Sequence, residues 1–311
     1  MSSTSLHVIV GAGPVGSSIA LRLAEAGHRV VVGTRSGSGP VHDLIERRKV
    51  DATDAKELQA LARGAATIVN CANPPYTSWP KDWPPMAEAM LKAAKQTEAG
   101  LITMSNLYGY GPKHQLMRAD TPLDATGPKG RVRADMWRNA LAAHDAGAVR
   151  VAEVRASDFF GPGVVDANMG ERVVPRVIRG KGVQLMGSAD EPHSFSYMPD
   201  VAATLFAVAT DETSWGRSWL VPSVNSTQRG MVTEFAKAAG VPAVKVSTVP
   251  NLVVSALGLV VPMMRALGEV RYQFASPFVA DAGETTTRFG VAATDIGTAC
   301  RETVAWWKAR A

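Results

Sequence analysis

The first half of the chain alternates short runs of β-branched residues with stretches that repeat apolar residues at helical spacing. The apolar runs predict strands at residues 6–10, 29–34, 66–72 and 101–105. The helical patterns between them cover residues 15–26, 55–64 and 86–100. The alternation continues with a helix over 131–146 and a strand over 149–157. This order of elements predicts a parallel sheet with right-handed crossovers.

The pattern becomes less regular beyond residue 157. The stretch FFGPGVVDANMG is rich in turn-forming residues, and the elements that follow it are short. A helix at 200–210 and a strand at 218–222 then resume the earlier rhythm. We therefore expect an α/β protein, with a doubly wound parallel sheet over residues 1–160 that is continued by about 196–224. A smaller, discontinuous substrate-binding cap would take residues 161–195 and 225–290, followed by a C-terminal helix at 291–311.

Three glycines follow the first predicted strand and precede the first predicted helix. They form the pattern Gly11-x-Gly13-x-x-Gly16, with Pro14 and Val15 inside it. In this setting the first glycine permits a tight turn, the second lets backbone approach a pyrophosphate, and the third lets the helix pack close to the sheet. The helix N-terminus adds free N–H groups and a positive partial charge. The pattern predicts a dinucleotide site on a Rossmann-type domain; a turn that only requires small residues is the plainer alternative.

The end of the second predicted strand bears on which dinucleotide is bound. An NAD site usually has an Asp or Glu here that accepts hydrogen bonds from the ribose. This chain has Thr34 and Arg35 instead. Arginine cannot accept a hydrogen bond, but it can pair with a 2′-phosphate. We therefore expect NADP rather than NAD at Thr34 and Arg35, with an exposed Arg35 of no cofactor role as the alternative.

Composition narrows the class of protein. The chain has 311 residues, of which 46% are hydrophobic and 20% charged, as in globular proteins with a sizeable core. Neither a disulfide framework nor a metal site is expected, because the only cysteines are Cys71 and Cys300 and no acidic or histidine set has ligand spacing. The net charge of +5 favours anionic ligands, without a nucleic-acid recognition motif. The proline cluster NPPYTSWPKDWPP at 73–85 predicts a loop.

The chain start and its later apolar run bear on location. The first residues lack the features of a signal peptide. The apolar run Leu252–Met264 is too short to span a bilayer, so it predicts a buried or substrate-lining helix. We expect a reduced cytoplasmic protein whose partner is a small-molecule substrate, with neither a membrane nor a nucleic acid as partner.

Further motifs carry a family resemblance. They are VDATD at 50–54, NCAN at 70–73, SNLYGYG at 105–111 and RASDFFGPG at 155–163. Together they resemble the extended and atypical short-chain dehydrogenase/reductases, the NAD-dependent epimerase/dehydratase group, over nearly the whole chain. The resemblance implies that Asp51 and the backbone of Ala52 hold the adenine. It also implies cofactor contacts from Cys71, Ala72, Asn73, Phe159 and Phe160. Dimers through the helix after the fifth strand are common in this family, so a homodimer is one expected assembly.

The sequence departs from this family at its catalytic pair. The family pattern Tyr-x-x-x-Lys lies on the helix after the fifth strand, where the tyrosine is the acid/base and the lysine holds the ribose. Lys129 stands at the tyrosine position and Arg133 at the lysine position. Arg133 could still bind the ribose, because it lies one helical turn beyond Lys129 on the same face. The family's serine or threonine, counted back four residues from Tyr108, falls on Met104, with Ser105 one residue later.

Candidates for proton transfer are Lys129, Tyr108, Tyr110 and Tyr197. A lysine works as an acid near neutral pH when burial or nearby cations depress its pKa; a solvent-exposed Lys129 at the helix entry is the alternative. Packing is the alternative role for Tyr108, whereas Tyr197 precedes a helix entry and is expected to face substrate. Lone histidines are more often structural, so His114 and His193 are not chosen.

These observations favour an NADP-dependent oxidoreductase that passes hydride to or from a carbonyl, imine or activated alkene of a small organic substrate. One alternative is an epimerase/dehydratase-type isomerase or lyase with tightly bound dinucleotide. The other is a non-catalytic NADP-binding sensor, which the missing tyrosine favours. Fold alone does not decide among the three. Net NADPH oxidation, retained NAD without net turnover, and binding without turnover are the results that distinguish them.

Overall fold

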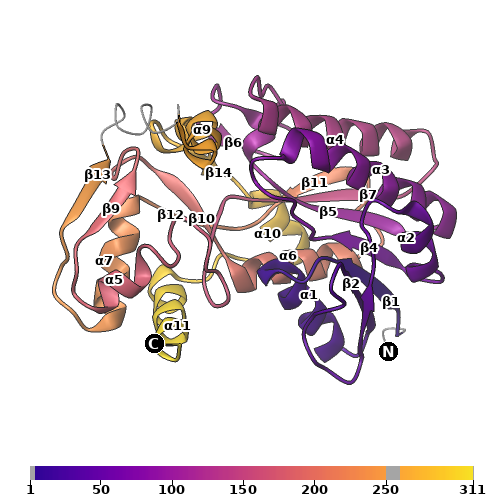
Figure 1. The fold of residues 1–311 in the computed structure, drawn as a ribbon, viewed down its shortest axis with the longest axis horizontal. Coiled ribbons are helices and arrows are strands. Elements are labelled where there is room, and N and C mark those ends of the chain that lie inside the picture. Colours follow the sequence, from indigo (N-terminus) through magenta and orange to yellow (C-terminus); the bar gives the residue numbers. More distant parts are fainter. Residues whose placement is uncertain (1–3, 250–259, 311) are drawn as a thin grey trace. The chain divides into compact units, whose positions relative to one another are not determined.

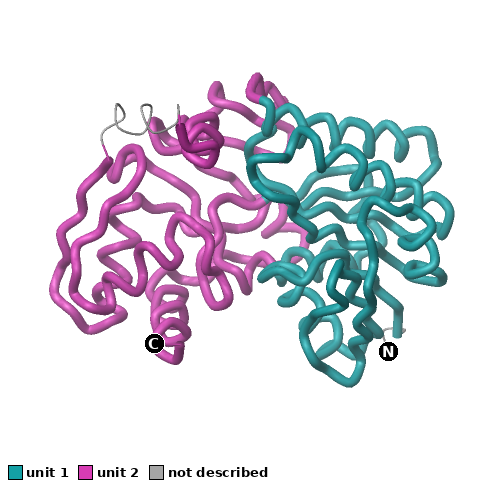
Figure 2. Tube along the Cα trace, in the orientation of Figure 1, with its two compact units in different colours: residues 1–109, 128–155, 202–219 teal, residues 110–127, 156–201, 220–311 magenta. Residues whose placement is uncertain are grey.

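The computed structural model describes residues 4–249 and 260–310, which divide into two compact units (Figure 2). The N-terminal unit takes residues 1–109, 128–155 and 202–219, and the C-terminal unit takes the remaining three segments. None of the helices in the described residues combines the length and apolar character needed to cross a membrane.

The N-terminal unit is built on a seven-stranded sheet with the order β11-β7-β5-β4-β1-β2-β3 (Figure 1). Strand β1 pairs in parallel with both β2 and β4, and the pairs β2–β3 and β4–β5 are parallel as well. The chain thus extends the sheet from β1 first in one direction and then in the other, as in doubly wound folds. The α/β class with a doubly wound parallel sheet is confirmed. The strands are β1 (Leu6–Val10), β2 (Arg29–Thr34), β3 (Ile45–Lys49), β4 (Thr67–Asn70), β5 (Gly100–Asn106), β7 (Val151–Ala156) and β11 (Arg217–Leu220).

Helices cover both faces of this sheet (Figure 1). On one face α1 lies next to α6, as shown by the Arg22 guanidinium of α1, which lies over the Phe206 ring of α6. The opposite face is covered by α2, α3 and α4, whose apolar side chains share a core with Val8, Val31 and Ile68 of the strands. The helices are α1 (Pro14–Glu25), α2 (Ala55–Leu61), α3 (Trp79–Thr97), α4 (Pro128–Asp145) and α6 (Met198–Thr210), with a short 3-10 helix at Tyr108–Tyr110.

Two elements differ from the sequence-based expectation. Helix α3 begins at Trp79 inside the proline cluster for which a loop is expected, because buried Trp79 and Trp83 anchor its first turns against the unit. Strand β3 is not expected from the sequence, since four of its five residues are exposed and the strand lacks an apolar alternation. It pairs with β2 at the edge of the sheet, where charged residues are common.

The N-terminal unit buries a histidine on its first strand. His7 is 1% exposed, its Nδ1 lies 2.8 Å from Thr67 Oγ1, and its ring meets His28 edge-on. Burial, assisted by the nearby His28, lowers the pKa of His7 from 6.5 to about 4. The folded unit therefore holds this imidazole neutral at every pH above that value.

We expect this histidine to make the protein less stable in mild acid. The unfolded chain takes up the proton at a higher pH than the folded chain. The free energy of unfolding is therefore unaffected by His7 above pH 6.5 and falls as the pH drops from 6.5 towards 4. The loss in the free energy of unfolding should reach about 2–3 kcal/mol. Urea unfolding at pH 7 and 4.5 measures it. The matched variant His7→Gln keeps a partner for Thr67 but does not titrate, so an equal pH dependence in both proteins would contradict this account.

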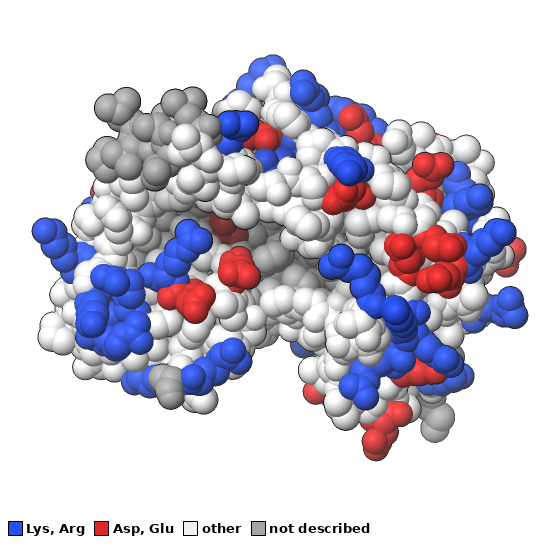
Figure 3. Space-filling view, viewed as in Figure 1, with Lys and Arg blue, Asp and Glu red and all other residues white. Residues whose placement is uncertain are grey.

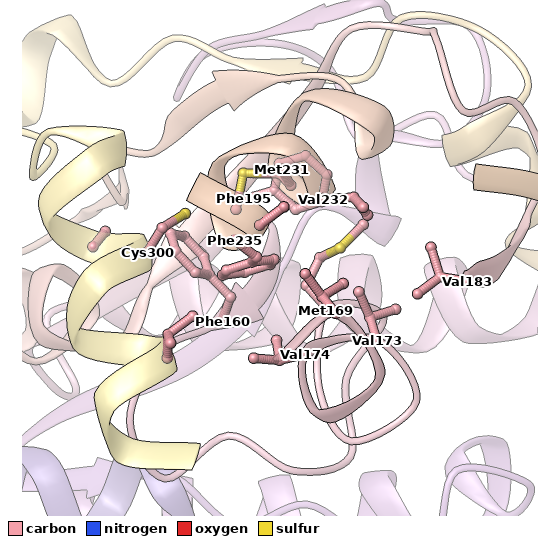
Figure 4. Packing of buried hydrophobic residues seen from close by; sticks show 14 of the residues in the cluster. Phe160, Met169, Val173, Val174, Val183, Phe195, Met231, Val232, Phe235 and Cys300 are labelled. Atoms are coloured by element: carbon pink, nitrogen blue, oxygen red, sulfur yellow. The ribbon is translucent and has the colours of Figure 1, made fainter. Parts of the chain in front are cut away.

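The C-terminal unit contains three small sheets and has its own core. Their orders are β12-β10-β8, β13-β9 and β14-β6. Figure 4 shows the core, in which Phe160, Phe195 and Phe235 pack with Met231 and Cys300. The strands are β6 (Leu116–Met117), β8 (Asp158–Phe160), β9 (Val183–Met186), β10 (His193–Tyr197), β12 (Val224–Ser226), β13 (Val246–Val249) and β14 (Val279–Ala280). The helices are α5 (Val174–Ile178), α7 (Gln228–Ala239), α9 (Pro262–Glu269), α10 (Gly283–Phe289) and α11 (Ile296–Lys308), with a 3-10 helix at Arg271–Phe274.

The unit boundaries differ in detail from those expected. Residues 110–127 belong to the C-terminal unit rather than to a domain over 1–160, because their strand β6 pairs with β14. The C-terminal helix α11 lies in the same core as α7, through Cys300 and Val304. Of the apolar run Leu252–Met264, the part up to residue 259 lies outside the described residues, and α9 begins at Pro262.

Candidate functional site

The glycine turn joins β1 to α1. Gly13 is the N-cap of α1, no side chain caps the helix, and Pro14 occupies its first turn. The N–H groups of Val15 and Gly16 have no helical acceptor at this position. A helix start that is not capped by a side chain leaves these donors and the positive end of the helix dipole for an anion.

The three glycines of the turn differ in the space that surrounds each of them. A Cβ at Gly16 would lie 1.9 Å from the Gly11 carbonyl oxygen, and one at Gly11 would lie 2.7 Å from the backbone nitrogen of Ala72. A Cβ at Gly13 would meet no atom within 4 Å. Gly11 and Gly16 are therefore required by the packing of the turn, whereas the backbone at Gly13 faces open space. This cradle fits the pyrophosphate of a dinucleotide.

The ends of β2 and β3 lead to the next expected cofactor residues. Thr34 donates its hydroxyl to the Ser38 carbonyl, and Arg35 is exposed. Asp51 is exposed, and its carboxylate accepts hydrogen bonds from the backbone N–H and hydroxyl of Thr53. These bonds, together with the positive charge of Arg35, hold the pKa of Asp51 below its usual value. The hydrogen bonds from Thr53 are the main cause of this shift, and the charge of the exposed Arg35 adds to it.

The end of β4 closes the site on the side of the glycine turn. Asn70 accepts a hydrogen bond from the Ala72 N–H at 3.2 Å, which fixes the backbone that faces Gly11. Burial raises the pKa of the Cys71 thiol to about 12, so Cys71 offers a neutral contact and no nucleophile. Asn73 is exposed, and Ala52 packs against the apolar core of the unit.

Lys129 lies in the first turn of α4 and is not exposed to solvent, contrary to one of the two alternatives for it. Its side chain is 4% exposed, and its Nζ lies 4.7 Å from the centre of the Tyr76 ring. The ring face attracts the ammonium group. The Tyr76 hydroxyl donates to the Tyr108 hydroxyl at 3.2 Å. The structure thus brings Lys129 and Tyr108 together through Tyr76, which the sequence did not single out.

Arg133 lies one turn further along α4 and is held by two indole rings. Its guanidinium carbon lies 4.2 Å from the centre of the Trp83 ring and 4.7 Å from that of Trp79. Its Nη1 donates to the Met104 carbonyl at 3.4 Å, while Nε has no hydrogen-bond partner among the described residues. Burial lowers the pKa of Arg133 to about 10, against the opposing effect of the Glu153 carboxylate. Arg133 is a fixed, buried cation beneath the site.

The remaining strand-end candidate is Ser105. It is 4% exposed and lies near the end of β5, next to the Met104 carbonyl that Arg133 binds. Lys129, Arg133, Ser105 and Tyr108 all belong to the N-terminal unit, as does the glycine turn.

The other expected site residues belong to the C-terminal unit. Tyr197 is 1% exposed and donates its hydroxyl to the Glu302 carboxylate, and burial raises its pKa. The expectation that Tyr197 faces substrate is wrong, because its ring packs on Phe160 in the core of the unit. Tyr110 is also buried and donates to the Arg118 carbonyl. Phe159 is half-buried on β8.

His193 makes polar contacts through both ring nitrogens in addition to its aromatic contacts. Its Nε2 lies 2.7 Å from Asp158 Oδ2 and its Nδ1 lies 3.1 Å from the Gln273 carbonyl. Phe274 and Phe278 stack on the imidazole. Both partners are acceptors, which makes His193 a buried anchor between β8, β10 and the 3-10 helix at Arg271–Phe274.

Sequence reasoning missed the aromatic side of the site. Tyr76, Trp79 and Trp83 come from the stretch NPPYTSWPKDWPP, for which the prolines alone predict a loop. The available signal is its density of large aromatic residues directly after a strand of a parallel sheet, where ligands usually bind.

Comparison with known proteins places this geometry in a family. The family model described as the NAD dependent epimerase/dehydratase family matches residues 7–219. No curated protein matches the chain in sequence. Among solved structures, the UDP-glucuronic acid 4-epimerase from Bacillus cereus in complex with NAD is 16% identical, with a TM-score of 0.78 over 98% of this chain and 99% of that chain. The UDP-glucose 4-epimerase from Thermotoga maritima is 14% identical, with a TM-score of 0.79 over 98% and 99%.

These comparisons correct the cofactor expectation. The Bacillus cereus epimerase and DesIV, the dTDP-glucose 4,6-dehydratase from Streptomyces venezuelae, both hold NAD; DesIV is 16% identical, with a TM-score of 0.76 over 98% of this chain and 97% of that chain. The expectation of NADP was wrong. It rested on the lack of an Asp or Glu at the end of the second strand and on Arg35, an exposed side chain whose charge also contributes to the lowered pKa of Asp51. The family match over residues 7–219 covers most of the sequence, and the solved structures share its fold over nearly the whole chain. The chain therefore belongs to the NAD-dependent epimerase/dehydratase family.

Proposed function

We propose that this protein is an NAD-dependent oxidoreductase that interconverts a hydroxyl-bearing carbon and a carbonyl in a small organic substrate. The observation that carries the proposal is the buried Lys129 with its Nζ over the Tyr76 ring, in the unit that holds the glycine turn. A buried ionisable side chain in the unit that holds the nucleotide cradle is a candidate for acid/base chemistry.

The residues of the turn fit NAD. The free N–H groups at the start of α1 and the open space at Gly13 would hold its pyrophosphate, and Asp51 can accept hydrogen bonds from its adenosine half. NAD, when bound, would supply the hydride acceptor or donor. The solved structures of this fold that hold NAD support the choice of cofactor.

Lys129 would exchange the proton with the substrate oxygen. As an ammonium it donates a proton to a carbonyl oxygen during reduction, and as an amine it takes the proton from a hydroxyl during oxidation. The Tyr76 and Tyr108 hydroxyls, 3.2 Å apart, offer a second hydrogen-bonding group next to it. Arg133, fixed between two indole rings, would add constant positive charge that stabilises a developing oxyanion.

The second candidate is an epimerase or dehydratase that oxidises and reduces its substrate within one cycle. The match to the epimerase/dehydratase family model favours it. In that case NAD stays bound, and the product contains no net oxidation. Both candidates use the same proton transfer at Lys129 and differ in whether the reduced cofactor is released.

Binding and turnover together test the proposal. Purified protein is titrated with NAD and with NADH, then incubated with NAD and a panel of hydroxylated compounds that includes sugar nucleotides. We expect Gly13→Val to weaken NAD binding at least tenfold while the unfolding transition is kept, because its side chain enters open space within the cradle. The control Gly268→Ala also adds a Cβ into open space, on helix α9 of the C-terminal unit, and should bind NAD normally.

The outcomes separate the candidates. Accumulating NADH with an oxidised product supports the oxidoreductase, whereas substrate conversion without NADH accumulation supports the epimerase or dehydratase. Equal NAD binding by Gly13→Val and the parent protein would show that the turn is not the cofactor site.

A further inference from the structure

The C-terminal unit has an open hollow bordered by α5 and the parallel pair β9–β13. It encloses about 610 Å³, and the residues that line it include Arg172, Arg176, Gln184, Lys245 and Ser247. Figure 3 shows Lys and Arg side chains gathered over this part of the unit. We call it the basic hollow.

The strand pair separates an apolar face from a polar one. Val183 and Leu185 are buried in the core of the unit, so Gln184 between them points outward. Ser247 of β13 lies opposite Gln184 in the register and is also exposed. The alternation therefore places an amide and a hydroxyl on the face that lines the hollow.

Arg176 is oriented by the backbone directly before β9. Its Nε donates to the Gly182 carbonyl at 2.9 Å. This bond uses one of five guanidinium N–H groups and fixes the plane of the fork, leaving the two terminal nitrogens to hold a ligand. An arginine positioned in this way loses less conformational entropy when it binds an oxyanion.

The cations of the basic hollow lack a countercharge. Within the described chain, Arg172, Arg176 and Lys245 form no ion pair with a carboxylate, and no acidic residue lines the hollow. Arg229 of α7 in the same unit, by contrast, is paired with Asp190. Three like charges around one open volume repel one another and raise the local positive potential. A multiply charged anion in the hollow would relieve this repulsion.

We propose that the basic hollow binds the phosphate group of a small phosphorylated molecule. A phosphate carries up to two negative charges and matches the arginine fork, whereas a single carboxylate would leave two of the three cations uncompensated. Single-stranded nucleic acid is disfavoured, because the hollow has no aromatic lining residue among the described residues on which a base could stack. Phosphate binding at this place is independent of the proposed hydride transfer.

Inorganic phosphate is the probe for this site. Its affinity is measured by calorimetry and by the thermal shift it causes, with chloride at the same ionic strength as reference and NAD present to occupy the glycine turn. We expect the double variant Arg172→Gln/Arg176→Gln to bind phosphate about tenfold more weakly than the parent protein. The matched control Arg179→Gln/Lys181→Gln removes the same charge from neighbouring exposed residues that do not line the hollow, and should bind as the parent does.

The variant Arg176→Lys tests the fork separately from the charge. It keeps the positive charge but loses the planar donor pair, so its affinity should fall between those of the parent and the double variant. Equal phosphate binding by the double variant and its control would overturn the proposal. Phosphate would then respond only to the overall positive charge of the protein and not to the residues of the hollow. These titrations need no turnover, so loss of binding in the hollow and failure of the proposed reaction are seen in different measurements.

Discussion

Replacing Lys129 by methionine is expected to lower kcat by a factor of about 10²–10⁴. Methionine keeps the length and apolar stem of a side chain that is 4% exposed, so the fold should be retained. What it removes is the ammonium group placed over Tyr76. The expected loss is in the chemical step, with a smaller change in KM. Steady-state kinetics with the substrate identified from the panel measure both quantities.

The matched control is Arg131→Met, an exposed cation two residues along the same helix. It should leave kcat within about twofold, as is usual for surface changes away from the site. A second variant, Tyr76→Phe, keeps the ring beneath Lys129 but removes the hydroxyl that binds Tyr108. If Lys129→Met retained full kcat while Tyr76→Phe lost it, the tyrosine hydroxyls would be the proton donors and the assignment to Lys129 would be wrong.

Much of the N-terminal unit could be predicted from local patterns. The alternation of apolar runs and helical spacing is strong there because strands of a parallel sheet are buried on both faces. Strand β3 was not predicted because its sequence IERRK is almost entirely polar and exposed. Only its pairing with β2 makes it a strand. The start of helix α3 was not predicted either, because the burial of two tryptophans outweighs the local effect of the prolines.

The candidate site was predictable in its backbone but less so in its side chains. The glycine turn depends on local geometry, which sequence spacing encodes directly. Tyr76 and Lys129 are 53 positions apart and meet only in the folded unit, where α4 packs against α3, so no local pattern signals their contact. Tyr197 was misassigned for the same reason, since its partner Glu302 lies more than a hundred residues away.

The surroundings of Arg133 suit an arginine better than a lysine. A guanidinium is planar and can lie flat against Trp79 and Trp83, which a lysine ammonium cannot do as well. The charge is kept inside the unit, and the Glu153 carboxylate on β7 acts on it electrostatically. Arg133 therefore connects the two tryptophans on the aromatic side of the site with the Glu153 carboxylate.

Glu153→Gln is expected to destabilise the protein by about 3–5 kcal/mol. Glu153 and Arg155 are 3% exposed, and their Oε2 and Nε atoms lie 2.6 Å apart. The carboxylate also opposes the effect of burial on Arg133, so its neutralisation leaves two buried guanidinium groups with less compensation. Urea unfolding at neutral pH gives the free energy directly. The control Glu46→Gln breaks an ion pair with Arg48 whose side chains are 50% and 61% exposed, and it should cost less than about 1 kcal/mol. If the two variants lost similar, small amounts of stability, water or local rearrangement would be compensating the buried charges, and Glu153 would not be the group that offsets the cost of burying Arg133.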